Sequence, residues 1–307
     1  MSWVFLALLS PLVFAIVNFL DKFIVENLIP DVRAMAVFGG IIGGFYGIVL
    51  WVVSGFPVIP AGDALLLLSS GMLTMLGAPV YFKVVAIEET SRLIVLAQCT
   101  PIFVLIFSLI FFRDSLSPEQ LLGFILILMA AVGISLVQQP HAATEPKKGF
   151  QLSQSFWLML IVTFFVAWSF LLGGNIRGEY PAIEIVVYVL LGLGLGSLGL
   201  YLFVGDIRRA FSMTTRTASS RALLIIGASE SVFVLARLLA ALAVADPKAA
   251  TSIVSVLGSV GVFYGIGIGW LLTILIPAIY REDISRSGLT RKLALSMVMF
   301  AGIILVN

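Results

Sequence analysis

The sequence predicts an all-α membrane protein with ten transmembrane helices arranged as two inverted five-helix repeats. Three observations predict this fold class: the composition, a series of long apolar runs, and a likeness between the two halves of the chain. Of the 307 residues, 61% are hydrophobic and 11% are charged, whereas an ordinary soluble domain has about 25% charged residues. Most side chains are therefore expected to face lipid, in an integral multi-pass protein of the cell (inner) membrane.

Each predicted helix is a continuous apolar run of roughly the 20 residues that a helix needs to cross the hydrocarbon core. The runs do not alternate between apolar and polar residues, which favours helices over a membrane barrel. The first run lacks the basic segment and cleavage site of a signal peptide, so it is expected to be retained. The ninth run is long and contains Pro277, which predicts a tilted, kinked or extended helix. The ten predicted spans are residues 3–20, 34–54, 63–84, 91–112, 118–137, 154–172, 182–204, 221–244, 249–280 and 287–306.

The chain is predicted to divide into residues 1–140 as the first five-helix repeat, 141–153 as a polar linker, and 154–307 as the second repeat. Because five is odd, the second repeat enters the membrane from the opposite side, and such inverted repeats place a binding site near the bilayer midplane. Short matches between the halves follow one another in the same order, at offsets that grow from 151 to 169 residues. The matches are NFL (18–20) with SFL (169–171), ALLLL (64–68) with ALLII (222–226), FFRDSL (111–116) with IYREDI (279–284), and GISLV (133–137) with GIILV (302–306).

The composition argues against several classes of function. The net charge of +2 is small and the Lys and Arg residues are scattered, so no nucleic-acid partner is expected. Cys99 is the only cysteine and lies in an apolar run, which indicates packing rather than a disulfide or a reactive thiol. The only histidine, His141, lies in the predicted linker. No His/Cys metal cluster, Ser/His/Asp triad or cofactor is therefore expected.

Two charged residues stand near the middle of the eighth span, Glu230 and Arg237. A charge at the centre of a span costs roughly 2.5 to 3.5 kcal/mol, so such residues normally face the bundle interior. Seven residues advance a helix by about two turns, or roughly 10 Å, so both side chains are expected on one face at different depths. At the repeat offset of 158, their first-half counterparts are the uncharged Met72 and Pro79. We expect Glu230 and Arg237 to contact a polar substrate or a coupling ion, and the alternative is an ion-pair network that locks helices together.

Three further inward candidates lie in the first span of each repeat and in the fourth span. Asn18 and Trp168 occupy adjacent positions of the two first spans, and an Asn in a span can equally serve as an interhelical hydrogen-bonding group. Gln98 precedes Pro101, which interrupts the backbone hydrogen bonds and can turn carbonyl groups toward a cavity.

For each of the remaining candidate site residues, an interfacial or packing role is the alternative to a place in the binding site. Tyr81 and Lys83 end the third span, where Lys83 is expected at the interface if its side chain extends out of the membrane. Ser255 belongs to a hydroxyl face of the ninth span, which indicates either pocket lining or packing. Asp21 and Lys22 end the first span and are expected at the interface rather than in the interior.

Residues 81–137 resemble the EamA-type branch of the drug/metabolite transporter superfamily. In that family a phrase of the type "alkytsas" precedes the fourth span, a Pro lies inside that span, an acidic residue follows in a short turn, and a Gly-bearing fifth span closes the repeat. The corresponding features here are AIEETSR (86–92), Pro101, Asp114, and Gly123 with Gly133. The second half resembles the same pattern through IYREDIS (279–285), with Glu282 at the turn, and Gly302. Asp114 departs from the family's usual Glu at the first turn.

The resemblance implies a secondary transporter that moves a small metabolite, such as an amino acid, a drug or a nucleotide-sugar-like compound, by antiport or facilitated exchange. From the residues, we expect an alternating-access carrier in which Arg237 attracts an anionic group and Glu230 holds a cationic group or takes up a coupling proton. The expected partners are a small-molecule substrate, a coupling proton or an exchanged solute, and the lipid bilayer. One alternative is a membrane-embedded enzyme acting on a lipid, although the sequence shows no nucleophile, base or metal cluster for it. Another is a receptor or scaffold that transports nothing.

The charges do not settle the orientation. Three Lys and Arg residues fall in loops on the side of both termini, namely Arg113, Arg177 and Lys248, and fourteen fall on the other side. The positive-inside rule would place the richer side in the cytoplasm and the termini outside. The family resemblance implies termini inside. The orientation and the oligomeric state therefore stay open.

Overall fold

The computed structural model describes residues 2–112, 117–135, 152–174, 179–246, 249 and 251–306. These residues form thirteen α-helices and one π-helical turn, and no strand lies among them. Their bounds are α1 (Trp3–Asn27), α2 (Ala34–Val53), α3 (Ala61–Ile87), α4 (Thr90–Ala97), α5 (Thr100–Phe107), the π turn (Ser108–Phe112), α6 (Pro118–Ser135), α7 (Gln154–Gly174), α8 (Ala182–Phe203), α9 (Gly205–Thr217), α10 (Ser220–Ala245), α11 (Thr251–Gly258), α12 (Gly261–Leu275) and α13 (Arg286–Val306). Asp114 and residues 141–151 of the predicted linker, which include His141, lie outside the described residues.

Within the described part of the chain, nine helical segments are long and apolar enough to cross a bilayer, and α6 is a shorter apolar helix over Pro118–Ile134. Large apolar side chains on their outer faces are exposed, such as Phe45 at 59%, Leu65 at 63% and Leu224 at 74%. Exposed apolar surface of this extent is expected where lipid is the solvent. The chain is therefore an integral multi-pass membrane protein.

The helices begin where the apolar runs begin, because each of the ten predicted spans starts within two residues of a described helix. Helix α1 continues to Asn27, beyond the predicted end at residue 20, so Asp21 lies inside a helix and is only 5% exposed. The prediction that Asp21 lies at the interface is wrong. Helix α9 was not predicted, since it is short and carries several charges.

The fourth and ninth predicted spans are both interrupted. Helix α4 has eight residues and is followed by a two-residue break before α5, and α11 and α12 show the same arrangement. At the breaks, the amide of Gln98 donates to the carbonyl of Val95, and that of Ser259 donates to Val256, so the backbone turns more tightly than in an α-helix. The first break immediately precedes Pro101, as predicted. The second has no nearby proline, and Pro277 lies after the end of α12.

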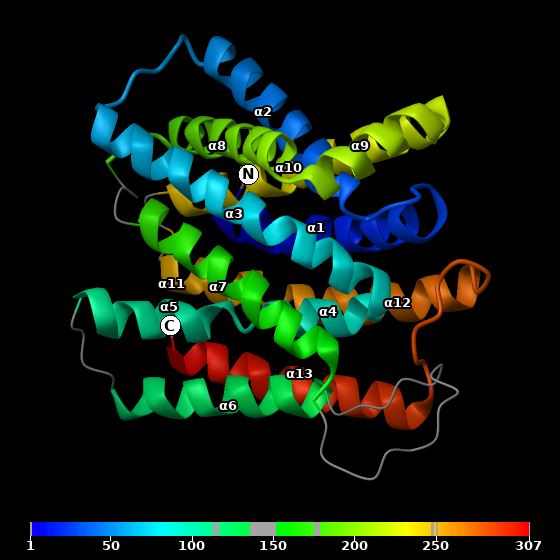
Figure 1. Cartoon of the computed structure of the whole chain (residues 1–307). Helices are drawn as coiled ribbons and strands as arrows, with labels where there is room; N and C mark the ends of the chain where they lie inside the picture. Colours follow the sequence, from blue (N-terminus) through cyan, green and yellow to red (C-terminus); the bar gives the residue numbers. More distant parts are fainter. Residues whose placement is uncertain are drawn as a thin grey trace.

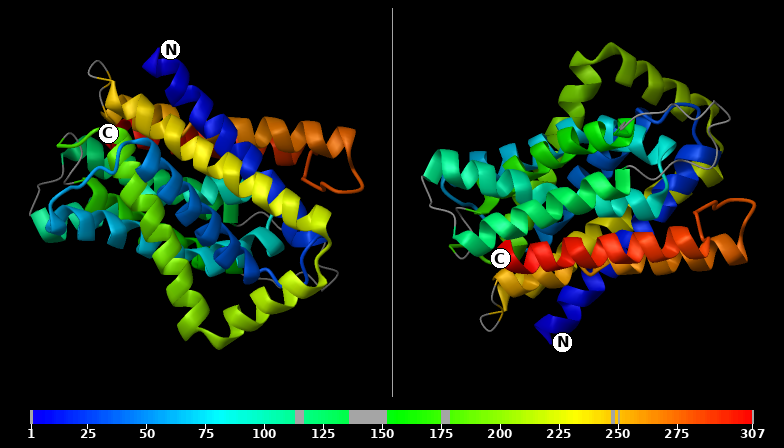
Figure 2. Two further views of the ribbon diagram at one scale, coloured as in Figure 1. Left: turned by 90° about the horizontal axis from the view of Figure 1, so that it is seen from above. Right: turned by 90° about the horizontal axis from the view of Figure 1, so that it is seen from below.

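The helices pack in a bundle whose loops gather at its two ends (Figure 1). Helix α2 lies along α8, α3 lies between α7 and α8, α1 lies along α10, and α6 lies along α13. Further views show α13 beside α12 and α1 beside α10 (Figure 2). The Ser10 hydroxyl in α1 donates to the carbonyl of Ala236 in α10 at 3.0 Å, and Ser229 of α10 donates to Asp21, so these two helices are antiparallel.

Glycine permits a close helix contact between α3 and α8. A Cβ added at Gly71 would overlap the backbone of Val189, and one added at Gly192 would overlap the backbone of Leu68. Small residues at such a crossing let two backbones approach, which strengthens packing where no hydrophobic effect operates between helices.

Candidate functional site

A cavity of about 600 Å³ lies between α1, α3, α7, α8 and α10. It extends from the middle of α10 to the C-terminal end of that helix, where Asp246, Ala249 and Tyr180 complete the lining. Since α1 and α10 are antiparallel, this is the end of the bundle at which α1 begins. Phe14, Val166, Phe170 and other apolar side chains form most of the wall. The volume suits a small organic molecule.

Hydroxyl groups occupy one wall of this cavity, where α3 meets α7. Ser70 donates to the backbone carbonyl of Ser169 at 2.9 Å, and the two hydroxyl oxygens are 2.8 Å apart. Thr74 donates to the Ser169 hydroxyl at 3.0 Å. At the cavity's outer edge, Tyr180 donates to Asp63 at 2.6 Å. These side chains give an otherwise apolar pocket a few polar groups with fixed positions, which is the usual way that a site orients a ligand.

Arg237 is the cation in the lining. Its guanidinium carbon lies 5.3 Å from the centre of the Phe233 ring on the same helix. Among the described residues, no carboxylate is found within ion-pair distance of it. A desolvated cation that rests on an aromatic ring keeps its hydrogen-bond donors available for an anionic ligand.

Glu230 lies deeper in the bundle, beside a second acid. Asp21 accepts a hydrogen bond from Ser229 at 3.1 Å and one from the Tyr81 hydroxyl at 3.2 Å. The same hydroxyl donates to the side-chain oxygen of Asn18 at 2.6 Å. Glu230 is 7% exposed, and its carboxylate rests against α2, where a Cβ added at Gly39 would lie 3.1 Å from both oxygens. Two acids therefore share one buried layer of the membrane-spanning region.

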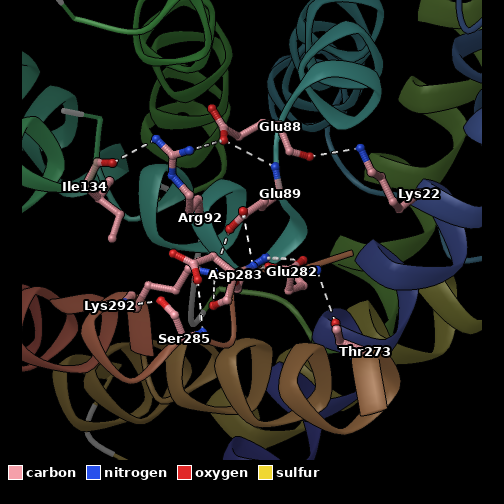
Figure 3. Close-up of polar contacts among 12 residues, drawn as sticks. Lys22, Glu88, Glu89, Arg92, Ile134, Thr273, Glu282, Asp283, Ser285 and Lys292 are labelled. Atoms are coloured by element: carbon pink, nitrogen blue, oxygen red, sulfur yellow. Dashed lines mark hydrogen bonds and ion pairs between the residues drawn. The ribbon is translucent and has the colours of Figure 1, made fainter. Parts of the chain in front are cut away.

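The opposite end of the bundle is closed by buried ions, here called the end network. It consists of Glu88, Glu89, Ser91 and Arg92 around the α3–α4 junction, Glu282 and Asp283 in the loop after α12, and Lys292 of α13 (Figure 3).

Arg92 joins three helices within the end network. Its guanidinium forms an ion pair with Glu88 at 2.8 Å, and both side chains are at most 2% exposed. It also donates to the carbonyl of Ile134 in α6 at 3.0 Å.

Lys22 of α1 holds the end of α3 by donating to the carbonyls of Val85 at 2.8 Å and Glu88 at 3.0 Å.

Lys292 ties the two halves of the chain together. Its ammonium group lies 2.6 Å from Glu89, 3.0 Å from the Ser91 hydroxyl and 3.4 Å from Glu282, and it is 3% exposed. Glu282 in turn accepts from the backbone amide of Ser91 at 3.2 Å and from the Ser91 hydroxyl. The acid thus lies at the N-terminus of α4, where the helix dipole favours negative charge.

The carboxyls in this loop differ in their electrostatics. Burial raises the pKa of Glu282, and the neighbouring Glu89 raises it further, while Lys292 and the hydrogen bonds from Ser91 oppose the shift. Asp283 is more exposed, and the hydrogen bond from Ser285 lowers its pKa. A second cavity of about 370 Å³ lies at this end and shares no lining residue with the first.

The structure brings some of the predicted site residues together and separates others. Asn18, Tyr81 and Glu230 lie together in the buried layer that contains Asp21. Arg237 lines the cavity two turns of α10 away from Glu230. Trp168 instead packs on Phe107 and Phe164, with ring centres 5.2 and 5.8 Å apart.

Two other candidates lie apart from the cavity lining. Lys83 is exposed on α3. Gln98 ends α4 at the break and is not part of the cavity lining. The side chain of Ser255 lies outside the described part of the chain.

Sequence reasoning missed Asp21, the hydroxyl wall and most of the end network. Ser70, Thr74 and Ser169 are common in membrane helices and carry no signal on their own. The pairing of Glu89 with Lys292 joins residues that are distant in the chain. A signal for part of the network existed, because Glu88 and Arg92 carry opposite charges four residues apart, although Glu88 ends α3 and Arg92 belongs to α4.

A bundle of apolar spans around a solute-sized cavity, with buried charges at one end, defines a multi-pass membrane protein built around an internal compartment. Residues 1–136 match the sequence model of the EamA-like transporter family. Members of the family are membrane transporters of small solutes rather than enzymes.

The chain was also compared with solved structures and with curated proteins. A crystal structure titled only "Crystal structure of protein" is similar at 16% identity with a TM-score of 0.53, covering 98% of this chain and 94% of that chain. At this identity the likeness concerns the fold alone. No curated protein matches the chain.

Proposed function

We propose that this protein is a secondary active transporter that moves a small polar metabolite by alternating access through the cavity beside Arg237. The proposal rests mainly on one observation, which is that the two ends of the bundle differ in how they are filled. The cavity reaches the end where α1 begins, and the end network closes the other end. A carrier needs this arrangement in one of its two states, and a mirrored arrangement in the other.

We infer that the carrier consists of ten spans in two inverted repeats. The helices support this, because the second-half helices begin 148 to 168 residues after their first-half counterparts, and from the second pair of helices onward this offset does not decrease along the chain. The two helix breaks lie at one offset of 161 residues. Helix packing has the same symmetry: α1 with α10 corresponds to α7 with α3, and α3 with α8 corresponds to α10 with α2.

The proposed substrate has an anionic group and an apolar body, and it is amino-acid-like or drug-like. Arg237 would bind the anionic group, the hydroxyl wall would accept or donate hydrogen bonds, and the apolar wall would hold the rest of the molecule. Glu230 would hold a coupling proton or a cationic group. The separation of about 10 Å along α10 between Glu230 and Arg237 exceeds that between the charges of a simple amino acid.

The proposal is tested by counterflow of radiolabelled metabolites in proteoliposomes that contain the purified full chain. The expected result is uptake that needs the protein and that Arg237→Gln reduces about tenfold or more, because a charge-assisted hydrogen bond contributes roughly 1.5 to 3 kcal/mol. Lys83→Gln is the matched control, since Lys83 is exposed and outside the cavity lining. Equal rates for Arg237→Gln and the wild type would remove Arg237 from the site.

A receptor or scaffold and a lipid-modifying protein remain the alternative functions. A receptor would bind a metabolite and stabilise the protein against heat, yet show no counterflow. A lipid-modifying protein would release a new lipid product when incubated with membrane lipids. Counterflow of a bound metabolite without a change in lipids supports the carrier over both.

A further inference from the structure

We propose that Asp21 and Glu230 form a proton-binding site inside the membrane, in which the two carboxyl groups hold one proton between them. The inference rests on the proposed transport function, which it deepens by naming the coupling ion. It starts from two acids on facing helices, α1 and α10, that are 5% and 7% exposed.

Ser229 is the structural link between the two acids. Its hydroxyl donates to Asp21, and Glu230 is the next residue in α10. Glu230 and Asp21 lie close enough to interact electrostatically, and both also interact with the Tyr81 hydroxyl in this way. Two like charges that are close together and shielded from water disfavour simultaneous ionisation.

In the described part of the chain, no Lys or Arg side chain lies close enough to Asp21 and Glu230 to neutralise both acids. Lys22 follows Asp21 directly, but its ammonium group bonds to the carbonyls of Val85 and Glu88 and pairs with Glu26 at 2.8 Å. Arg237 lies two turns from Glu230, about 10 Å along the helix axis. A proton is therefore the smallest positive charge that balances the pair.

The other helices around the pair contribute polar groups without formal charge. Helix α3 contributes Tyr81 and α2 contributes Gly39, while Tyr46 of α2 donates to Ser231 at 3.0 Å on the next turn of α10. From α8, Ser197 donates to the carbonyl of Val37 at 3.1 Å. None of these groups supplies a charge that would replace the proton.

The contacts indicate which acid carries the proton. Asp21 has two hydroxyl groups directed at its oxygens, which stabilise its ionised form. Glu230 has no hydrogen bond or ion pair with any described residue, and its carboxyl group rests on the bare backbone at Gly39. Glu230 is thus the protonated member and Asp21 the ionised one.

The inferred repeat shows that the fold does not require these acids. At an offset of 151 the counterpart of Asp21 is Leu172, and at 158 the counterpart of Glu230 is Met72. Asp21 belongs to α1 of the first inferred repeat, and Glu230 belongs to α10 of the second. Each acid is therefore an addition to one of the two copies of the five-helix unit, and the two acids meet where α1 packs on α10.

The test is infrared difference spectroscopy on the purified full chain in a detergent without ester groups. A protonated carboxyl group gives a carbonyl band distinct from that of a carboxylate. The wild type is expected to show such a band at neutral pH, where exposed acids are ionised. Glu230→Gln is expected to remove it, whereas Asp21→Asn is expected to keep it and to move its loss to lower pH by about one unit, because the neighbouring charge is gone.

The controls separate this site from other acids and other ions. Glu119→Gln removes an exposed acid at the start of α6 and is expected to leave the band unchanged. Absence of the band in the wild type between about pH 5 and 9 would overturn the proposal, as would full intensity in Glu230→Gln. Loss of the band on replacing choline chloride with sodium chloride at constant pH would identify a sodium site instead.

The outcome is independent of transport, because no substrate is present. A protein that shows the band but no counterflow would refute the transport function and leave the proton site in place. A protein that transports without the band would refute the shared proton alone.

Discussion

Lys292→Met is the substitution that most directly perturbs the end network. It leaves Glu89 and Glu282 without the ammonium group that lies 2.6 and 3.4 Å from them, while the methionine fills most of the space. Removing one partner of a buried ion pair costs about 3 to 5 kcal/mol. This end of the bundle should therefore open roughly 100- to 3,000-fold more often, since each 1.4 kcal/mol is a factor of ten.

The assay is the rate at which a membrane-impermeant thiol reagent modifies a cysteine placed within the network. Thr90→Cys is a suitable reporter, because Thr90 is 3% exposed at the α3–α4 junction. Cys99→Ser supplies a background without other thiols, since Cys99 is the only cysteine. The modification rate should increase in Lys292→Met by the factor given above, up to the limit at which this end is always open.

Two controls make the result specific to the end network. Arg209→Ala removes an 85% exposed cation that lies 3.8 Å from Asp206, and a surface pair of this kind contributes less than about 1 kcal/mol. Adding Glu89→Gln to Lys292→Met should recover part of the closure, because it removes an uncompensated buried charge. An unchanged modification rate in a folded Lys292→Met protein would refute the role of the network in closing this end.

Three further predictions follow from the same structure. The raised pKa of Glu282 means that its contribution to closure is complete below its ordinary value of 4.5 and is lost as the pH rises through the raised value. Thr90→Cys should therefore react faster at higher pH by more than thiolate formation alone explains, and Glu282→Gln should abolish this excess. Ala241→Cys, in the cavity lining, should react with the thiol reagent and be protected by substrate, whereas Ala243→Cys, at a fully buried position of the same helix, should not react. Gly71→Val should destabilise the protein by about 1 to 3 kcal/mol, measured as a lower Tm, while Gly199→Ala, whose Cβ would meet nothing within 4 Å, should leave Tm unchanged.

The sequence predicts where the long helices begin because lipid imposes a simple requirement on it. A span must be continuously apolar, so the starts of α2, α6, α7 and α8 coincide with the starts of their predicted runs. Helix α9 is not predicted by this requirement, because it has no continuous apolar run. It packs instead through one buried face, formed by Ile207, Ala210 and Thr214. The break before α12 has no proline to indicate it.

The site was only partly predictable, for a reason visible at Asp21. Glu230 stands out because it interrupts an apolar run from both sides, so its burial follows from composition alone. Asp21 follows the apolar run of α1 and precedes Lys22, which is also the pattern of an interfacial residue. Only the continuation of α1 to Asn27 and the contact with Ser229 place it in the interior. Partners of this kind depend on which helices pack together, and a single sequence does not state that.

The inferred repeat also explains why this end of the bundle is the closed one. Two of the four acids of the end network have acidic counterparts, since Glu88 corresponds to Asp246 at an offset of 158 and Glu282 to Asp114 at 168. Its two cations have none, because Arg92 corresponds to Ile253 at 161 and Lys292 to Phe124 at 168. The positions that correspond to these two cations are therefore uncharged. Under the proposed alternating access, the buried pairs of Arg92 and Lys292 would favour the state with the end network closed until a ligand or a proton compensates for their contribution.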